Sequence, residues 1–136
     1  MRYLCFDIGE KRTGVASGDD ETGLAGPVEV IESAGEDALI EKMIGVIERE
    51  RVREIVVGLP LHMDGVEGKR AEAVRRIGER VRERSGCLVH YHDERLSSFA
   101  ADGKMARSEL TRGQKKARRD ALAAAAILQD FLDDRE

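Results

Sequence analysis

The chain has 136 residues, a net charge of −4, 37% charged and 41% hydrophobic residues. This composition is typical of a soluble globular protein and excludes a disordered chain, and the length fits one domain covering residues 1–136. The longest apolar run, 121–128, is far shorter than the ~20 residues that cross a membrane, and no secretory segment precedes Asp7. We therefore expect a cytoplasmic protein without a membrane partner.

The first predicted elements are strands over residues 2–8 and 13–18, and Asp7 stands at the end of the first. A carboxylate at the tip of a buried strand loses solvation, which a metal ion or another cation must offset. Gly9 and Gly14 leave room for a tight turn or for close approach to a ligand. The pattern therefore indicates a site at the end of a sheet, although Asp7 could also simply cap a hairpin.

Strands and helices then alternate along the chain. The expected strands cover residues 27–31, 54–59 and 88–92, and the expected helices cover 36–51, 67–85, weakly 97–108, and 117–133. A strand hairpin followed by this alternation predicts an α/β fold, with a single mixed sheet covered by helices on both faces. In such sheets, sites gather beyond the ends of the strands.

Two further acids are expected near Asp7. Glu94 follows the strand 88–92, although strand parity alone leaves open whether Glu94 or Asp93 faces the site. Asp120 opens the apolar stripe of the last helix, where its basic neighbours could alternatively supply an ion-pair partner. Three converging carboxylates suit hard, oxygen-preferring cations, and we expect Mg²⁺ or Mn²⁺.

The three histidines give weaker signals. His90 and His92 share one face of a strand and could hold zinc, but the sequence favours the polar side of a half-buried strand. His62 lies in a Gly-Leu-Pro-Leu-His-Met-Asp-Gly loop, where a phosphate or metal contact is an open alternative.

A basic segment precedes the last helix. Between residues 104 and 119 the sequence has seven basic residues and one acid, so this window carries +6 and the remainder −10. Such a strip is a candidate phosphate-binding surface, because binding responds to the local field more than to the total charge. The alternative is an ordinary solvated surface. Its basic residues are Lys104, Arg107, Arg112, Lys115, Lys116, Arg118 and Arg119.

Four sequence blocks together resemble the YqgF/RuvX family, which has a ribonuclease-H-like fold related to the Holliday junction resolvase RuvC. The blocks are F-D-I-G-E-K-R-T-G-V-A (6–16), V-V-G-L-P-L-H-M-D-G (56–65), D-E-R-L-S-S (93–98) and K-K-A-R-R-D-A-L-A-A-A-A-I-L-Q (115–129). They span nearly the whole chain. His62 departs from the asparagine usual in the family, which makes the role of that loop uncertain.

The resemblance implies a nuclease. By this resemblance Asp7, Glu94 and Asp120 form a catalytic, metal-binding triad for Mg²⁺ or Mn²⁺, and the substrate is the 5′ end of precursor 16S rRNA or branched DNA. The pre-ribosomal small subunit is then a further partner, and the protein a monomer or weak homodimer. The expected nucleic-acid contacts are Lys11, Arg12, Arg95, Lys115, Lys116, Arg118 and Arg119.

Two other classes of protein fit parts of the pattern. An actin-like nucleotide-binding domain also opens with an acid and glycines in a strand hairpin, but that architecture needs two such domains and the chain has room for one. A non-catalytic nucleic-acid-binding module or ribosome-assembly factor would look the same in sequence, although retention of all three acids argues against it.

Overall fold

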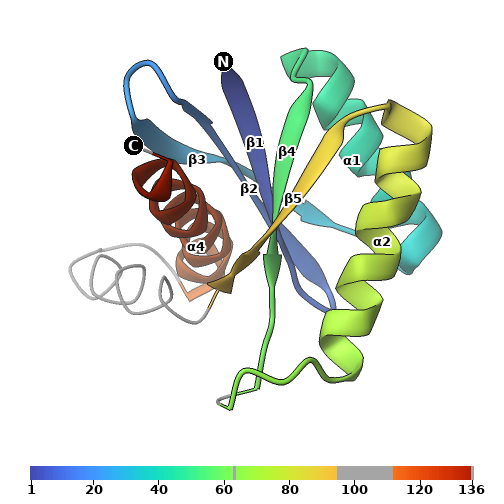
Figure 1. Ribbon diagram of the computed structural model, residues 1–136. Helices are drawn as coiled ribbons and strands as arrows, with labels where there is room; N and C mark the ends of the chain where they lie inside the picture. Colours follow the sequence, from blue (N-terminus) through green and yellow to red (C-terminus); the bar gives the residue numbers. More distant parts are fainter. Residues whose placement is uncertain (63, 95–111, 136) are drawn as a thin grey trace.

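The computed structural model describes residues 1–62, 64–94 and 112–135, with the backbone alone for 112–118. These residues form a five-stranded sheet in the order β3-β2-β1-β4-β5, with α1 and α2 on one face and α4 on the other (Figure 1). This is the predicted fold class. The elements are β1 Arg2–Ile8, β2 Arg12–Asp19, β3 Leu24–Glu32, α1 Glu36–Glu50, β4 Glu54–Leu59, α2 Lys69–Ser85, β5 Leu88–Asp93 and α4 Arg112–Asp134.

The pairing of the strands brings distant segments to one edge. β1 runs antiparallel to β2 and parallel to β4, which in turn runs parallel to β5. The C-terminal ends of β1, β4 and β5 therefore meet at the same edge of the sheet, beside the start of β2. This topology places Asp7 and Glu94 at a common edge although they are 87 positions apart in the sequence.

Each face of the sheet packs against its own hydrophobic cluster, because side chains alternate along a strand. Phe6 and Val57 face α1 and α2, whereas Cys5 and Val56 face α4. The backbone of α4 can lie close to the sheet, because three of its buried side chains are alanines. These are Ala121, Ala124 and Ala125, and Ile127 is buried beside them.

Several element boundaries differ from the sequence prediction by a few residues. The second helix begins at Lys69 instead of residue 67, and the preceding residues form an isolated bridge between Leu61 and Glu67. The last helix begins at Arg112, five residues earlier than expected. Gly86 ends α2 in the left-handed conformation at φ 75°, as its position predicted. The expected helix 97–108 lies outside the described residues.

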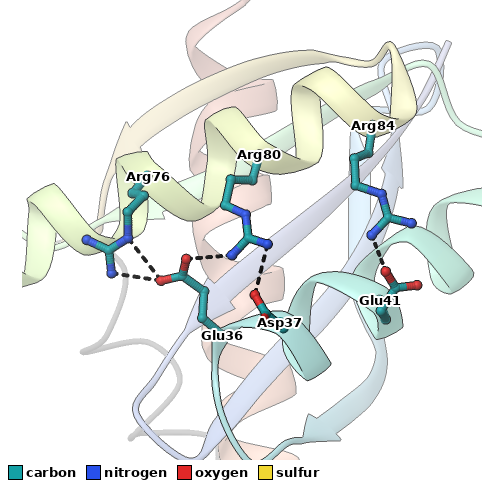
Figure 2. Close-up of polar contacts among 6 residues, drawn as sticks. All are labelled: Glu36, Asp37, Glu41, Arg76, Arg80 and Arg84. Carbon is teal, nitrogen blue, oxygen red and sulfur yellow. Dashed lines mark hydrogen bonds and ion pairs between the residues drawn. The ribbon is translucent and has the colours of Figure 1, made fainter.

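Acids of α1 and arginines of α2 form an ion-pair ladder between the two helices (Figure 2). Glu36 accepts hydrogen bonds from Arg76 at 2.7 Å and from Arg80 at 2.7 Å. Arg80 also reaches Asp37, and Arg84 pairs with Glu41. These hydrogen bonds lower the pKa of Glu36 and of Glu41 below their ordinary values. The spacing of the arginines, four residues apart, keeps them on one helix face.

No helix among the described residues is long and apolar enough to cross a membrane.

Candidate active site

Asp7 and Glu94 meet at the sheet edge on the face covered by α4. Cys5 packs in the α4-side cluster, so Asp7, two residues further, points to the same side. His92 packs against Phe131 of α4, and Glu94 follows it by two residues. The two carboxyl groups share a hydrogen bond. The sequence left open whether Asp93 or Glu94 faces the site. The structure places His92 on the α4 face, and it is Glu94, two residues further, that contacts Asp7.

The carboxyl group of Asp7 is held in a costly environment. Burial, then the negative charge and the hydrogen bond of Glu94, and then the charge of Asp120 raise the pKa of Asp7 to about 7. Cys5 lies two residues before Asp7 on the same face of β1. Burial and then the charges of Asp7 and Glu94 raise the pKa of the Cys5 thiol well above its ordinary value, so this thiol carries no charge. The hydrogen bond between two carboxyl groups requires a proton, which a bound cation would replace.

Glycine at two strand positions lets the acids and α4 approach the sheet. A Cβ on Gly58 would lie 3.1 Å from Oε2 of Glu94 and 2.8 Å from Cδ1 of Ile127. A Cβ on Gly14, the partner of Asp7 across β1 and β2, would overlap the backbone carbonyl of Asp120. Gly14 was predicted to permit a close approach, and the structure shows that α4 is what comes close.

Asp120 reaches the site through an ion pair with β2. Nε of Arg12 lies 2.7 Å from Oδ2 of Asp120, and the two side chains are 36% and 30% exposed. The sequence suggested a partner among the basic neighbours of Asp120, but the described partner is 108 positions away. Asp120 is near enough for its charge to raise the pKa of Asp7. Arg12, predicted to contact nucleic acid, is thus also the counter-ion of the third acid.

Sequence reasoning missed Arg70, which lies on the other side of Asp7. Nη2 of Arg70 donates a hydrogen bond of 2.7 Å to the carbonyl oxygen of Ile8, and its charge favours the ionised form of Asp7. Arg70 is exposed and stands with Lys69 in the first turn of α2. Cations are unfavourable at a helix N-terminus. The two adjacent cations Lys69 and Arg70 at the start of α2 are therefore the sequence signal that could have indicated an anionic ligand at this position.

The remaining predicted nucleic-acid contacts are only partly described. Lys11 and Arg119 are exposed. Arg95, Lys115, Lys116 and Arg118 lie outside the residues whose side chains are described, so their role stays a prediction.

The two histidines of β5 lie on a half-buried strand and bond to polar partners, as the sequence favoured. His90 and His92 lie on the α4 face and pack against Phe131, with only 22% and 15% of their side chains exposed. Nε2 of each ring forms a hydrogen bond with a carboxylate, His90 with Glu54 at 2.7 Å and His92 with Asp130 at 2.6 Å. They are therefore half-buried polar side chains that pack between β5 and α4.

The comparison with family models decides the relationship. Residues 1–134 match the RuvX family, described as "Holliday junction resolvase". The chain belongs to this family.

Three of the relatives that it matches, each named "Putative pre-16S rRNA nuclease", illustrate the similarity. That of Chloroflexus aurantiacus is 37% identical and covers 97% of this chain and 86% of its own. Those of Oenococcus oeni and of an Anaeromyxobacter species are 40% and 38% identical, covering 98% and 99% of this chain and 94% and 98% of theirs.

Solved structures confirm the ribonuclease-H-like fold of this RuvX-family chain. RuvC of Thermus thermophilus in complex with a Holliday junction substrate has a TM-score of 0.63 at 14% identity, covering 99% of this chain and 95% of its own. The fowlpox virus resolvase with Holliday junction DNA has a TM-score of 0.62 at 12% identity and covers 99% of both chains. At these identities the likeness shows the fold alone.

The chemistry of the predicted triad fits a hard divalent cation. Three carboxylates from three elements gather at a partly buried edge, and Asp7 and Glu94 lie so close that they compete for a proton. The oxygens of Asp7, Glu94 and Asp120 do not form a group with all members within 4.8 Å, since among the described residues another trio alone meets that limit. Asp120, engaged by Arg12, would have to turn from that arginine to complete the set.

Proposed function

We propose that this RuvX-family protein is a metal-dependent endonuclease that hydrolyses phosphodiester bonds and processes the 5′ end of precursor 16S rRNA. The observation that carries the proposal is the contact between Asp7 and Glu94, two acids with no arginine or lysine in an ion pair with either among the described residues. A structural role would not need such a pair, because a buried pair of acids destabilises a fold. The names of the relatives support the substrate.

Asp7, Glu94 and Asp120 would hold Mg²⁺ or Mn²⁺, the ions preferred by all-oxygen donor sets. When bound, such an ion would lower the pKa of water in the site and offset the charge that develops on the phosphate. With the ion bound, Asp7 and Glu94 would both be ionised. Asp120 would have to leave Arg12 to join them, and that guanidinium would then be available to a phosphate.

The two arginines beside the acids would orient the substrate. Arg12 and Arg70 approach the carboxylates from β2 and from α2, on elements fixed by the sheet. A guanidinium can donate two hydrogen bonds to one phosphate, so each arginine would fix a backbone phosphate next to the bond that is cleaved. Lys11 and the basic strip 104–119 would extend this contact along the strand.

A junction-resolving activity is the second candidate function. The family description and the fold of two resolvases that bind Holliday junctions favour it. A ribonuclease-H-like site contacts phosphates, so discrimination between RNA and DNA must come from the 2′-hydroxyl or from shape. With three Phe, two Tyr and no Trp, the chain has few aromatic side chains on which to stack bases. We therefore place the pre-ribosomal small subunit among its partners, as the source of sequence specificity.

The test is a cleavage assay of the purified protein on precursor 16S rRNA, on single-stranded RNA and on four-way DNA, with Mg²⁺ or Mn²⁺. We expect metal-dependent cleavage of the RNA substrates with a loose sequence preference, and none by Asp7→Asn. Accumulation of 5′-extended 16S precursor after depletion in cells would agree. Efficient symmetric nicking of four-way DNA, with normal 16S ends after depletion, would favour junction resolution instead.

A further inference from the structure

A second group of metal-ligating side chains lies outside the triad, between β5 and the last turns of α4. One ring nitrogen of His92 and one carboxylate oxygen each of Asp130 and Asp134 all lie within 4.8 Å of one another. Asp130 and Asp134 are four positions apart, so they lie on one face of the helix and point to the same strand. The group contains none of the three acids of the proposed active site.

The imidazole of His92 is held in place before any ligand arrives. Its side chain is 15% exposed, packs edge-on against Phe131 at 5.9 Å between ring centroids, and hydrogen-bonds Asp130 at 2.6 Å. Because β5 is paired with β4 along its length, the ring cannot move far from α4. The nitrogen donor is therefore pre-organised, which reduces the entropy lost on binding.

The charge around this group is unbalanced. Among the described residues, no lysine or arginine forms an ion pair with Asp130 or with Asp134. The cation next in sequence, Arg135, stacks over the rings of Phe131 and Tyr3 instead, at 5.1 and 5.8 Å from their centroids. A His–Asp pair alone would need a single carboxylate, whereas here an oxygen of Asp134 also lies within 4.8 Å of both residues.

We propose that His92, Asp130 and Asp134 form a binding site for a Zn²⁺-like divalent cation, which ties the end of α4 to β5. A tetrahedral zinc ion with bonds of about 2.0–2.1 Å keeps its ligands roughly 3.3 Å apart. The His92–Asp130 contact of 2.6 Å would therefore widen, while the other pairs start from within 4.8 Å. An imidazole beside carboxylates favours Zn²⁺ over Mg²⁺. Three protein ligands leave a fourth position for water.

The two elements that a cation would join here, β5 and α4, also position two of the proposed catalytic acids. His92, on β5, precedes Glu94 by two residues, and Asp130 and Asp134 stand on α4, the helix that also carries Asp120. A cation in this second site would hold β5 and α4 together independently of substrate. The site does not rest on the proposed nuclease function, because it uses other side chains.

The experiment measures Zn²⁺ binding by calorimetry and Co²⁺ binding by its visible absorption, in the full chain carrying Asp7→Asn to weaken the triad. We expect one Zn²⁺ per chain, not displaced by excess Mg²⁺, and an affinity at least about tenfold lower in Asp134→Asn and in His92→Gln. The matched control is Asp133→Asn, which removes the same charge from the same helix turn outside the group. Asp133 accepts only a hydrogen bond from Gln129, and its variant should bind Zn²⁺ like the parent.

Two results would overturn this site. One is the absence of saturable Zn²⁺ binding in the Asp7→Asn chain. The other is an equal loss of affinity in Asp133→Asn and Asp134→Asn, which would mean that Zn²⁺ responds to the general charge of the helix. Asp134 is exposed, so its substitution leaves the fold intact and a loss of binding in that variant cannot come from unfolding.

Discussion

Carboxylates stand in two contrasting environments in this molecule. On the α1–α2 surface, arginines surround the acids, and hydrogen bonds from Arg76 and Arg80 lower the pKa of Glu36 (Figure 2). At the sheet edge, burial and a neighbouring acid raise the pKa of Asp7 to about 7. Arginine is present at the sheet edge too, where Arg12 pairs with Asp120, but among the described residues no arginine or lysine forms an ion pair with Asp7 or Glu94. The difference indicates that the sheet-edge charge is kept for a ligand that the fold itself does not provide.

The largest expected effect is on kcat, which substitutions of the sheet-edge acids should lower and a substitution in the α1–α2 ladder should not. Asp7→Asn or Glu94→Gln should lower kcat for RNA cleavage at least about a hundredfold, since loss of even an outer-shell partner of a metal costs 10–100-fold. Glu41→Gln makes the same chemical change in the ladder and should leave kcat unaltered. Steady-state kinetics on one RNA substrate compares the three variants, and wild-type turnover by Asp7→Asn would end the metal-triad account.

The second effect is a pH dependence of stability in the metal-free protein. The pKa of Asp7 is about 7 in the fold and near 4 when unfolded, so the folded state binds the extra proton between these values. Stability from this group is therefore complete below pH 4 and is lost as the pH rises to about 7. Relative to Asp7→Asn, the wild type should lose on the order of 3 kcal/mol over this range.

Urea unfolding of both proteins in chelator, from pH 4 to pH 8, checks this difference. Taking the difference between two chains cancels the titration of the other acids. A wild-type chain that gains stability over Asp7→Asn as the pH rises would contradict the burial of an uncompensated carboxyl group. Excess Mg²⁺ or Mn²⁺ should reverse the trend for the wild type alone.

A third test asks whether the arginines near the acids serve the substrate. Arg70→Met should weaken binding of single-stranded RNA to the Asp7→Asn chain several-fold and reduce the slope of log K against log salt by about 0.7. Arg76→Met, in the ladder, should change neither quantity. Fluorescence anisotropy at several salt concentrations measures both, and equal behaviour of the two variants would assign Arg70 to holding the Ile8 carbonyl only.

The smallest effect is expected in the ladder itself. Glu36→Gln should cost less than about 1 kcal/mol, because pairs at a surface are screened by water. The loss should shrink as salt rises, since the Debye length falls to about 3 Å at 1 M. Thermal unfolding at low and high salt gives the comparison. A large, salt-independent loss would show that Glu36 belongs to the core of the helix pair.

The sequence predicted those features that depend on local pattern. Asp7 at a strand end, Glu94 after the fifth strand and Asp120 on the inward stripe of α4 could all be found from alternation and helical spacing. Contacts that depend on packing could not be predicted. Arg12 meets Asp120 across 108 positions, and Arg70 reaches Ile8 across 62. No local pattern encodes such distances, because they follow from the order of the strands and the angle of each helix.

The histidines illustrate the same limit. Their shared strand face was predicted correctly, but which side of the sheet that face occupies depends on register. His92 pairs with Gly58 in β4, and this register turns the ring towards α4 and Asp130. A shift by one residue would have turned both rings to the opposite face, which α1 and α2 cover.

The central claim is that Asp7 and Glu94 are brought together to hold a divalent cation. Mn²⁺ binding by the metal-free wild-type chain and by Glu94→Gln, measured by calorimetry at pH 7 after Zn²⁺ is removed, tests it most directly. The account predicts saturable binding with release of a proton in the wild type, and at least about tenfold weaker binding in Glu94→Gln. Equal Mn²⁺ affinity in the two proteins, or none in the wild type, would contradict it.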